Sequence, residues 1–133
     1  MVPTWHGCWP APASARGFRM LGYRTDVPAL MAAADVFVLP SHLEGLPMAV
    51  IEAMLTGLPV VATDIRGPRE QVVDCVTGLL VPRGEAAPLA AALARLAADP
   101  DLRAVMGAAG RARAAARYDE SKVIARTLDL LGL

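Results

Sequence analysis

Short apolar runs alternate with amphipathic stretches along most of the chain. Most of the runs are four or five residues long, rich in Val and Leu, and bounded by Gly, Pro or Asp. Short, continuous runs of this kind are typical of strands buried on both faces of a parallel sheet. We therefore predict strands at residues 18–22, 35–39, 59–63 and 78–81.

Between and after these runs, apolar residues recur at the spacing of a helix. Asp26 suits the N-cap of a helix over residues 27–34, and Pro47 and Gly57 suit the first turn and the end of a second helix. Further helices are predicted at residues 68–73 and 85–98, from Pro100 onward, and after Asp119. In the helix from Pro100, the predicted inward-facing residues are Leu102, Val105, Met106 and Ala109. Strands that alternate with helices indicate an α/β fold with a doubly wound parallel sheet.

Composition narrows the class of protein. The chain has 133 residues, enough for one domain, and its 13 basic and 13 acidic residues balance, which gives no electrostatic reason to expect nucleic acid as a partner. No apolar run approaches the roughly 20 residues that span a bilayer. Cys8 and Cys75 form no disulfide framework, and His6 and His42 have no clustered carboxylates or thiols beside them. We therefore expect a cytoplasmic protein with no metal site and no cofactor.

Two glutamates eight residues apart are the leading candidates for chemistry. Glu44 lies in a Gly/Pro turn after the predicted strand 35–39, and Glu52 lies inside the helix that follows. Ligands of parallel sheets bind at the carboxyl ends of the strands, where Glu44 falls. Glu52 lies at the edge of the helix's apolar arc, where a carboxylate is costly unless it is paired or contacts a ligand. From spacing alone, two alternatives stay open: the acids grip two ends of an elongated ligand, or they are solvated or paired with arginine.

Three ordered motifs resemble those of a known family. EGLPMAVIEAMLTGLPVVATD (residues 44–64) is similar to the E-x7-E signature of retaining glycosyltransferases with the GT-B fold, known as glycosyl transferases group 1 or family 4. The similarity continues in DIRGPREQVVDCVTGLLVPRGE (residues 64–85) and in LGYRTDVPALMAAADVFVLPS (residues 21–41). The resemblance implies a Rossmann-like C-terminal nucleotide-sugar-binding domain, present in part, at residues 18–133.

The resemblance also assigns roles to individual residues. It implies that Glu44 is catalytic and faces the donor sugar and its phosphate end, and that Glu52 accepts hydrogen bonds from both ribose hydroxyls of the nucleotide. A carboxylate is a suitable bidentate acceptor for a cis-diol. Backbone N–H groups of Gly45, Leu46 and Met48 at the helix N-terminus would meet the diphosphate.

Four further residues near these motifs are secondary candidates. Thr63 ends the next strand and is a donor-site candidate. His42 and Arg66 either contact the donor or are simply solvated. Glu70 either contacts the donor or only satisfies the helix dipole from the first turn. Arg66 stands where family members often have a second glycine. Cys75 stands where a turn glycine is usual, and we interpret it as a tolerated variant whose backbone avoids positive φ.

The resemblance stops short of a whole enzyme. The opening strands of the domain, with the basic pair that neutralises the diphosphate, have no counterpart, and residues 1–17 are irregular and unlike the family. We therefore expect a truncated protein that has no transferase turnover alone and binds nucleotide weakly at most. The intact enzyme would transfer a sugar from a nucleotide diphosphate sugar, with retention and without a metal, to a sugar or lipid-linked acceptor held by a missing N-terminal domain.

Two alternatives to a transferase stay open: a nonfunctional fragment, and a standalone nucleotide-sugar-binding module. The resemblance is also compatible with a peripheral position at the inner face of the membrane.

The family's C-terminal helix crosses back to the N-terminal domain, so Leu128 and Leu131 should be exposed here and could support self-association.

Overall fold

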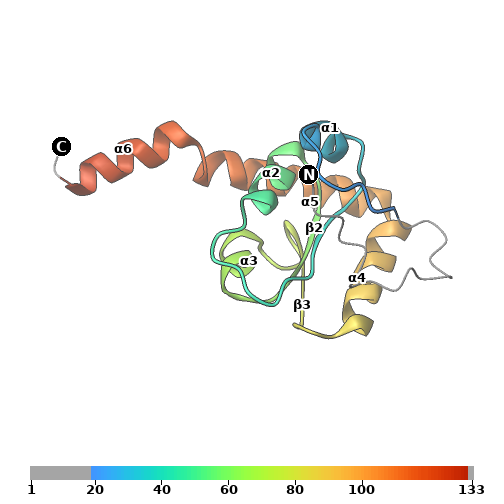
Figure 1. Cartoon of the computed structure of the whole chain (residues 1–133). Helices are drawn as coiled ribbons and strands as arrows, with labels where there is room; N and C mark the ends of the chain where they lie inside the picture. Colours follow the sequence, from blue (N-terminus) through green and yellow to red (C-terminus); the bar gives the residue numbers. More distant parts are fainter. Residues whose placement is uncertain (1–18, 132–133) are drawn as a thin grey trace, which may run out of the picture.

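The computed structural model describes residues 19–131 of the chain (Figure 1). A parallel three-stranded sheet with the order β1-β2-β3 forms its centre, and helices connect and cover the strands. This arrangement confirms the predicted α/β, Rossmann-like fold class. The elements are α1 (Val27–Ala32), β1 (Phe37–Leu39), α2 (Met48–Thr56), β2 (Val60–Thr63), α3 (Arg66–Gln71), β3 (Gly78–Val81), α4 (Ala86–Ala98), α5 (Pro100–Arg117) and α6 (Glu120–Leu131).

The central strand, β2, is buried on both faces. Its alternate residues point into two separate apolar clusters, with Val60 and Ala62 in one and Val61 in the other. The first cluster adds residues of α1 and α2 and Ala114 of α5, and the second adds residues of α4 and Met106 of α5. Helices therefore cover both faces of the sheet, which explains why the strands read as continuous apolar runs.

The predicted strand at residues 18–22 is wrong for the residues that the structure describes. Residues 19–22 are irregular, and Phe18 lies outside the described part. A strand needs a hydrogen-bonded neighbour, and the sheet described here pairs only β1, β2 and β3 with one another. The apolar pattern alone could not reveal that this segment has no pairing partner.

Helix α1 begins at the predicted residue, whereas helix α3 begins earlier than predicted. Asp26 occupies the N-cap of α1 but makes no side-chain cap bond, because its carboxylate accepts two hydrogen bonds from Arg24 at 2.7 and 2.6 Å. These bonds lower the pKa of Asp26. Helix α3 begins at Arg66, two residues before the predicted start, since Pro68 is tolerated in a first turn that lacks internal N–H partners.

Glycines decide how α5 packs against α2. Val105 was predicted to face inward but is 67% exposed, whereas Gly107 and Gly110 are buried. A Cβ atom at Gly107 would lie 2.0 Å from the carbonyl oxygen of Gly57, so the two helices approach closely only because that side chain is absent. Gly57 ends α2 in the left-handed conformation, with φ of 86°, as predicted from its position.

The last helix, α6, extends away from the rest of the described structure (Figure 1). Asp119 precedes it and accepts a hydrogen bond from the Ser121 N–H at 3.0 Å, in agreement with its predicted capping role. Leu128 is 43% exposed, and the side chain of Leu131 lies outside the described part. Self-association through this helix stays a prediction. Among the described residues, no helix is both long enough and apolar enough to cross a membrane.

Candidate functional site

A pocket opens where β1 and β2 end at the same edge of the sheet. The loop after β1 and the start of α3 form its walls, and its volume is about 630 Å³. The lining residues are Leu43, Glu44, Gly45, Leu46, Arg66 and Glu70. The structure therefore places two segments, residues 43–46 and residues 66–70, around one pocket at the edge where parallel sheets bind ligands.

Glu44 is held in place by a short relay of hydrogen bonds. The Ser41 hydroxyl donates to Glu44 Oε1 at 2.7 Å, and the Thr63 hydroxyl donates to the Ser41 carbonyl oxygen at 2.6 Å. Thr63 is 3% exposed and does not line the pocket. Its contact braces the loop that carries Glu44. Ser41, to which the sequence motifs assigned no role, is the link between them.

Gly67 brings the two walls into direct contact. A Cβ atom at this position would lie 2.6 Å from the Gly45 carbonyl oxygen, 2.9 Å from Pro47 Cδ and 3.1 Å from the Glu44 carbonyl oxygen. Only glycine leaves room for the loop to rest on the first turn of α3. The second wall of the pocket is thus fixed against the first by backbone contact.

Glu52 lies apart from the pocket lining. Its side chain is exposed on α2, and its carboxylate makes no hydrogen bond or ion pair with the residues between 19 and 131. Within that range the arginine-paired alternative does not hold, whereas the exposed side chain fits the alternative of a solvated acid. Five residues of helix separate Glu52 from Pro47, a rise of roughly 7.5 Å, so Glu52 and the pocket can be reached together only by an elongated ligand.

Charged residues of α3 form the outer side of the pocket. Arg66 and Glu70 are separated by 3.9 Å between Nε and Oε1, and their side chains are 91% and 64% exposed. An exposed pair of this kind contributes little to stability, so Arg66 is free to turn toward a ligand. The pocket thus carries two carboxylates, which can accept hydrogen bonds from hydroxyl groups, and one arginine, which can bind an anionic group.

Two other candidates border the site without lining the pocket. His42 is exposed, and its carbonyl oxygen accepts a hydrogen bond from Arg83 at 3.4 Å. Met48, the first residue of α2, is 58% exposed. Among the described residues, no group of three or more His, Cys, Asp or Glu side chains is placed to hold a metal ion.

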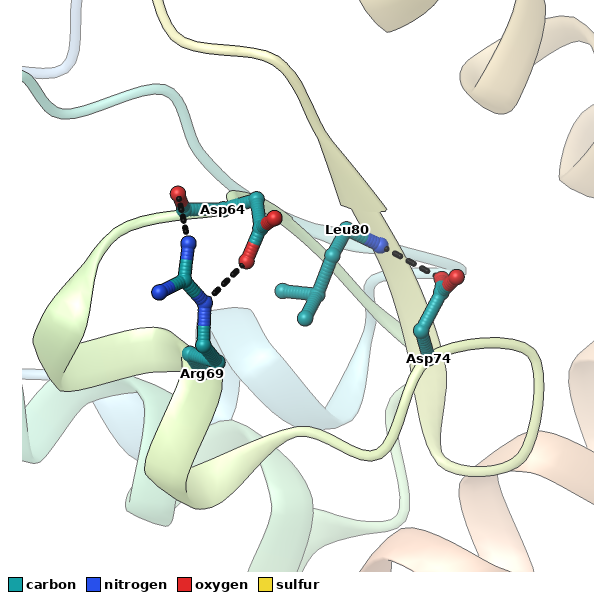
Figure 2. A network of polar contacts seen from close by, with 4 residues as sticks. All are labelled: Asp64, Arg69, Asp74 and Leu80. Carbon is teal, nitrogen blue, oxygen red and sulfur yellow. Dashed lines mark hydrogen bonds and ion pairs between the residues drawn. The ribbon is translucent and has the colours of Figure 1, made fainter.

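Polar contacts beside the site hold the turn after β2 and the turn before β3 (Figure 2). The Arg69 guanidinium donates to Asp64 Oδ1 at 2.6 Å and to the Asp64 carbonyl oxygen at 3.0 Å, and the first of these bonds raises the pKa of Arg69. The Leu80 N–H donates to Asp74 Oδ1 at 2.9 Å. Asp64 follows β2, and Asp74 precedes β3. The two aspartates therefore fix the connections on either side of α3, which place this helix at the pocket.

Cys75 corrects one expectation from the sequence. The residue is exposed and has φ of 61°, a left-handed conformation that side chains other than glycine rarely adopt. The expectation that its backbone avoids positive φ is therefore wrong. The Cys75 N–H donates to the Gly78 carbonyl oxygen at 2.8 Å, and this tight turn into β3 imposes the conformation.

Comparisons with known proteins identify relatives of much greater length. The chain is 36% identical over 109 residues to the putative glycosyltransferase EpsD of Bacillus subtilis. The aligned region covers 82% of this chain and 28% of EpsD. It is also 36% identical over 110 residues to N,N'-diacetylbacillosaminyl-diphospho-undecaprenol alpha-1,3-N-acetylgalactosaminyltransferase of Campylobacter jejuni, covering 83% of this chain and 29% of the relative. The chain therefore spans less than a third of the length of these relatives.

Solved structures also include a longer protein that resembles this chain. Anabaena HepE in complex with UDP superimposes with a TM-score of 0.81 at 34% identity, covering 84% of this chain and 31% of HepE. The family model for glycosyl transferases group 1 matches residues 15–113, which is most of the chain. This chain belongs to the GT-B glycosyl transferases of group 1 and represents part of their C-terminal region.

Proposed function

We propose that this chain supplies part of the donor site of a glycosyltransferase that moves a hexosyl group from a nucleotide diphosphate sugar to an acceptor with retention of configuration. The observation that carries this proposal is the pocket of Glu44, Gly45 and Leu46 at the carboxyl edge of the sheet, beside the N-terminus of α2. The crystal structures of HepE with UDP and with UDP-glucose support a nucleotide sugar as the ligand class.

Each proposed role follows from what the side chain or backbone can do. Glu44, half-buried and oriented by Ser41, would act as the catalytic residue at the donor sugar. Glu52, exposed and without a side-chain partner in residues 19–131, would accept hydrogen bonds from the two ribose hydroxyls. The rise along α2 from its N-cap, Pro47, to Glu52 suits a ligand with a sugar at one end and a nucleoside at the other.

The diphosphate would lie between these two ends. Backbone N–H groups of Gly45, Leu46 and Met48, together with the positive end of the α2 dipole, would stabilise the charge that develops on the departing nucleotide. Arg66 would turn from its weak contact with Glu70 toward a phosphate oxygen. This arrangement needs no metal ion to neutralise the leaving group.

Three candidates take secondary roles in the proposal. Glu70, which lines the pocket, and His42, which borders it, would contact sugar hydroxyls. Thr63 is a less direct contributor, because its hydroxyl already donates to Ser41 and it would act by holding the Glu44 loop.

The names of two relatives support a class of acceptor for the proposal. Two relatives carry names that specify undecaprenol-linked acceptors, in Escherichia coli and Campylobacter jejuni. We propose a lipid-linked or sugar acceptor held by an N-terminal domain, and a cytoplasmic enzyme that works at the inner face of the membrane.

Titration of the chain with UDP tests the donor site directly. We expect weak binding by nuclear magnetic resonance or calorimetry, and a loss of about tenfold or more in Glu52→Gln, since hydrogen bonds to a charged group contribute roughly 1.5–3 kcal/mol. Asp129→Asn is the matched control, because it removes one exposed carboxylate from α6. Equal UDP affinity in Glu52→Gln and the wild type would refute the assigned role.

A transfer assay separates the enzyme from the alternatives. With radiolabelled UDP-glucose, the chain alone should give no turnover, because it spans less than a third of the length of its relatives. UDP binding without turnover supports a donor-site part or a standalone binding module, whereas absence of binding supports a nonfunctional fragment. Robust turnover by the chain alone would contradict the proposal that it is only part of the site.

A further inference from the structure

Gln71 is a buried polar residue behind the pocket, and neither the sequence motifs nor the proposed donor contacts assign it a role. It ends α3, its side chain is 0% exposed, and it lies next to Val72 of the first apolar cluster. Its Nε2 group donates to the Pro47 carbonyl oxygen at 3.1 Å. Its Oε1 atom is buried and has no hydrogen-bond partner in the described part of the chain.

A buried amide that satisfies only one of its groups is unfavourable for stability compared with an apolar side chain of similar size. The fold nevertheless places it where its donor reaches the N-cap of α2. Pro47 has no N–H group, so its carbonyl oxygen is the backbone polar group through which this position can be held. That oxygen also accepts the Val50 N–H at 3.1 Å, which makes it the junction between the Glu44 loop and α2.

Gln71 is itself anchored from the other side by α5. The Arg113 Nε group donates to the Gln71 carbonyl oxygen at 2.7 Å, and Arg113 Nη2 donates to the Glu70 carbonyl oxygen at 3.1 Å. An arginine that binds the last carbonyls of a helix fixes the end of that helix. The contacts therefore run without interruption from α5 through the end of α3 to Pro47.

We propose that Gln71 is a positioning residue for the donor site, which fixes the Pro47 carbonyl and thereby the backbone N–H groups of Leu46 and Met48 on either side. The absence of a side chain at Gly67 lets the same loop lie against α3. Gln71 adds a hydrogen bond that sets the orientation of this loop. The hydrogen bond from Arg113 to the Gln71 carbonyl oxygen fixes the position of the Gln71 backbone. The functional part of this inference rests on the proposed donor site, whereas the loop-fixing part does not.

Gln71→Met tests the inference, because methionine keeps the length and removes the donor. We expect UDP affinity about tenfold weaker than in the wild type, which corresponds to about 1.4 kcal/mol. Leu96→Val, in the cluster on the opposite face of the sheet, is the control for a general loss of stability. Both variants are compared at a temperature where each is folded. Wild-type affinity in Gln71→Met, or an equal loss in Leu96→Val, would overturn the proposal.

Amide hydrogen exchange without ligand separates failure of this inference from failure of the donor site. Gln71→Met should speed exchange at Gly45, Leu46 and Met48 relative to Leu96→Val. Unchanged exchange at these amides would overturn the inference even if UDP binds. Faster exchange in a chain that does not bind UDP would keep the loop-fixing role and reject the donor site.

Should Gln71→Met fail to fold, Arg113→Lys provides the same test with a milder change. Lysine keeps the charge but cannot hold both carbonyl oxygens at once. We expect faster exchange at the same amides and a smaller loss of UDP affinity than in Gln71→Met. Wild-type exchange in Arg113→Lys would contradict the anchoring role of Arg113.

Discussion

Replacing Gly67 by alanine should force the two walls of the pocket apart. The new methyl group would lie 2.6 Å from the Gly45 carbonyl oxygen, and an ordinary contact requires at least 3.4 Å, so the backbone must move by roughly 0.8 Å. The obstructing atom belongs to the backbone and cannot rotate away. Overpacking of this kind costs about 1–3 kcal/mol, and the higher helix propensity of alanine offsets at most about 1 kcal/mol. We expect a net loss of about 1–2 kcal/mol in the free energy of unfolding.

Urea unfolding followed by circular dichroism measures this loss. With a urea dependence of about 1–3 kcal/mol per molar for small proteins, the midpoint should fall by roughly 1 M. Gly45→Ala is the matched control, since a Cβ atom at Gly45 would meet no other atom within 4 Å and the φ of this glycine is not in the left-handed range. The unfolding free energy of Gly45→Ala should stay within about 0.5 kcal/mol of the wild type.

The same variant also tests the link between the two walls and ligand binding. Gly67→Ala should weaken UDP binding under conditions where the protein is fully folded, because the displaced loop carries Glu44 and the proposed diphosphate amides. An unfolding midpoint equal to that of the wild type would refute the close-contact reasoning. A reduced midpoint with unchanged UDP affinity would show that the contact serves stability alone.

Three further predictions concern positions away from the pocket. Gly107→Ala should destabilise the chain by about 3 kcal/mol or more, since its Cβ would lie 2.0 Å from the Gly57 carbonyl oxygen; a thermal melt equal to that of the wild type would contradict the helix contact. Cys75→Gly should stabilise the chain by about 0.5–1 kcal/mol in urea unfolding, because glycine adopts the left-handed conformation without strain and the exposed thiol gives up no packing; a lower midpoint would count against this reasoning. The hydrogen bonds from Arg24 lower the pKa of Asp26 in the folded state, so their stabilising effect is present above the unfolded pKa of about 4 and is lost as the pH falls through the lowered value. The difference in melting temperature between the wild type and Asp26→Asn should therefore shrink as the pH is lowered through this range, and a constant difference would exclude the pair as its source.

The sequence alone determined the fold class and most of the elements. Continuous apolar runs at residues 35–39, 59–63 and 78–81 predicted the three strands, because strands covered on both faces need apolar residues at every position. Pro47 and Gly57 correctly marked the ends of α2 to within a residue, because their backbone preferences act locally. The sequence also singled out Glu44, Arg66 and Glu70 as candidate site residues, and the structure brings them around one pocket.

Tertiary structure decided the features that depend on contacts between distant segments. The Thr63–Ser41 bond joins residues 22 positions apart, and the Gln71–Pro47 bond joins residues 24 positions apart, so no local pattern signals either. The inward face of α5 was assigned from apolar side chains, yet its closest approach to α2 is made by Gly107, which an apolar pattern overlooks. Local propensity and periodicity thus specify which elements form, because they act within a few residues. The space available at each contact, and the partner of each buried polar group, are set only when the elements pack together.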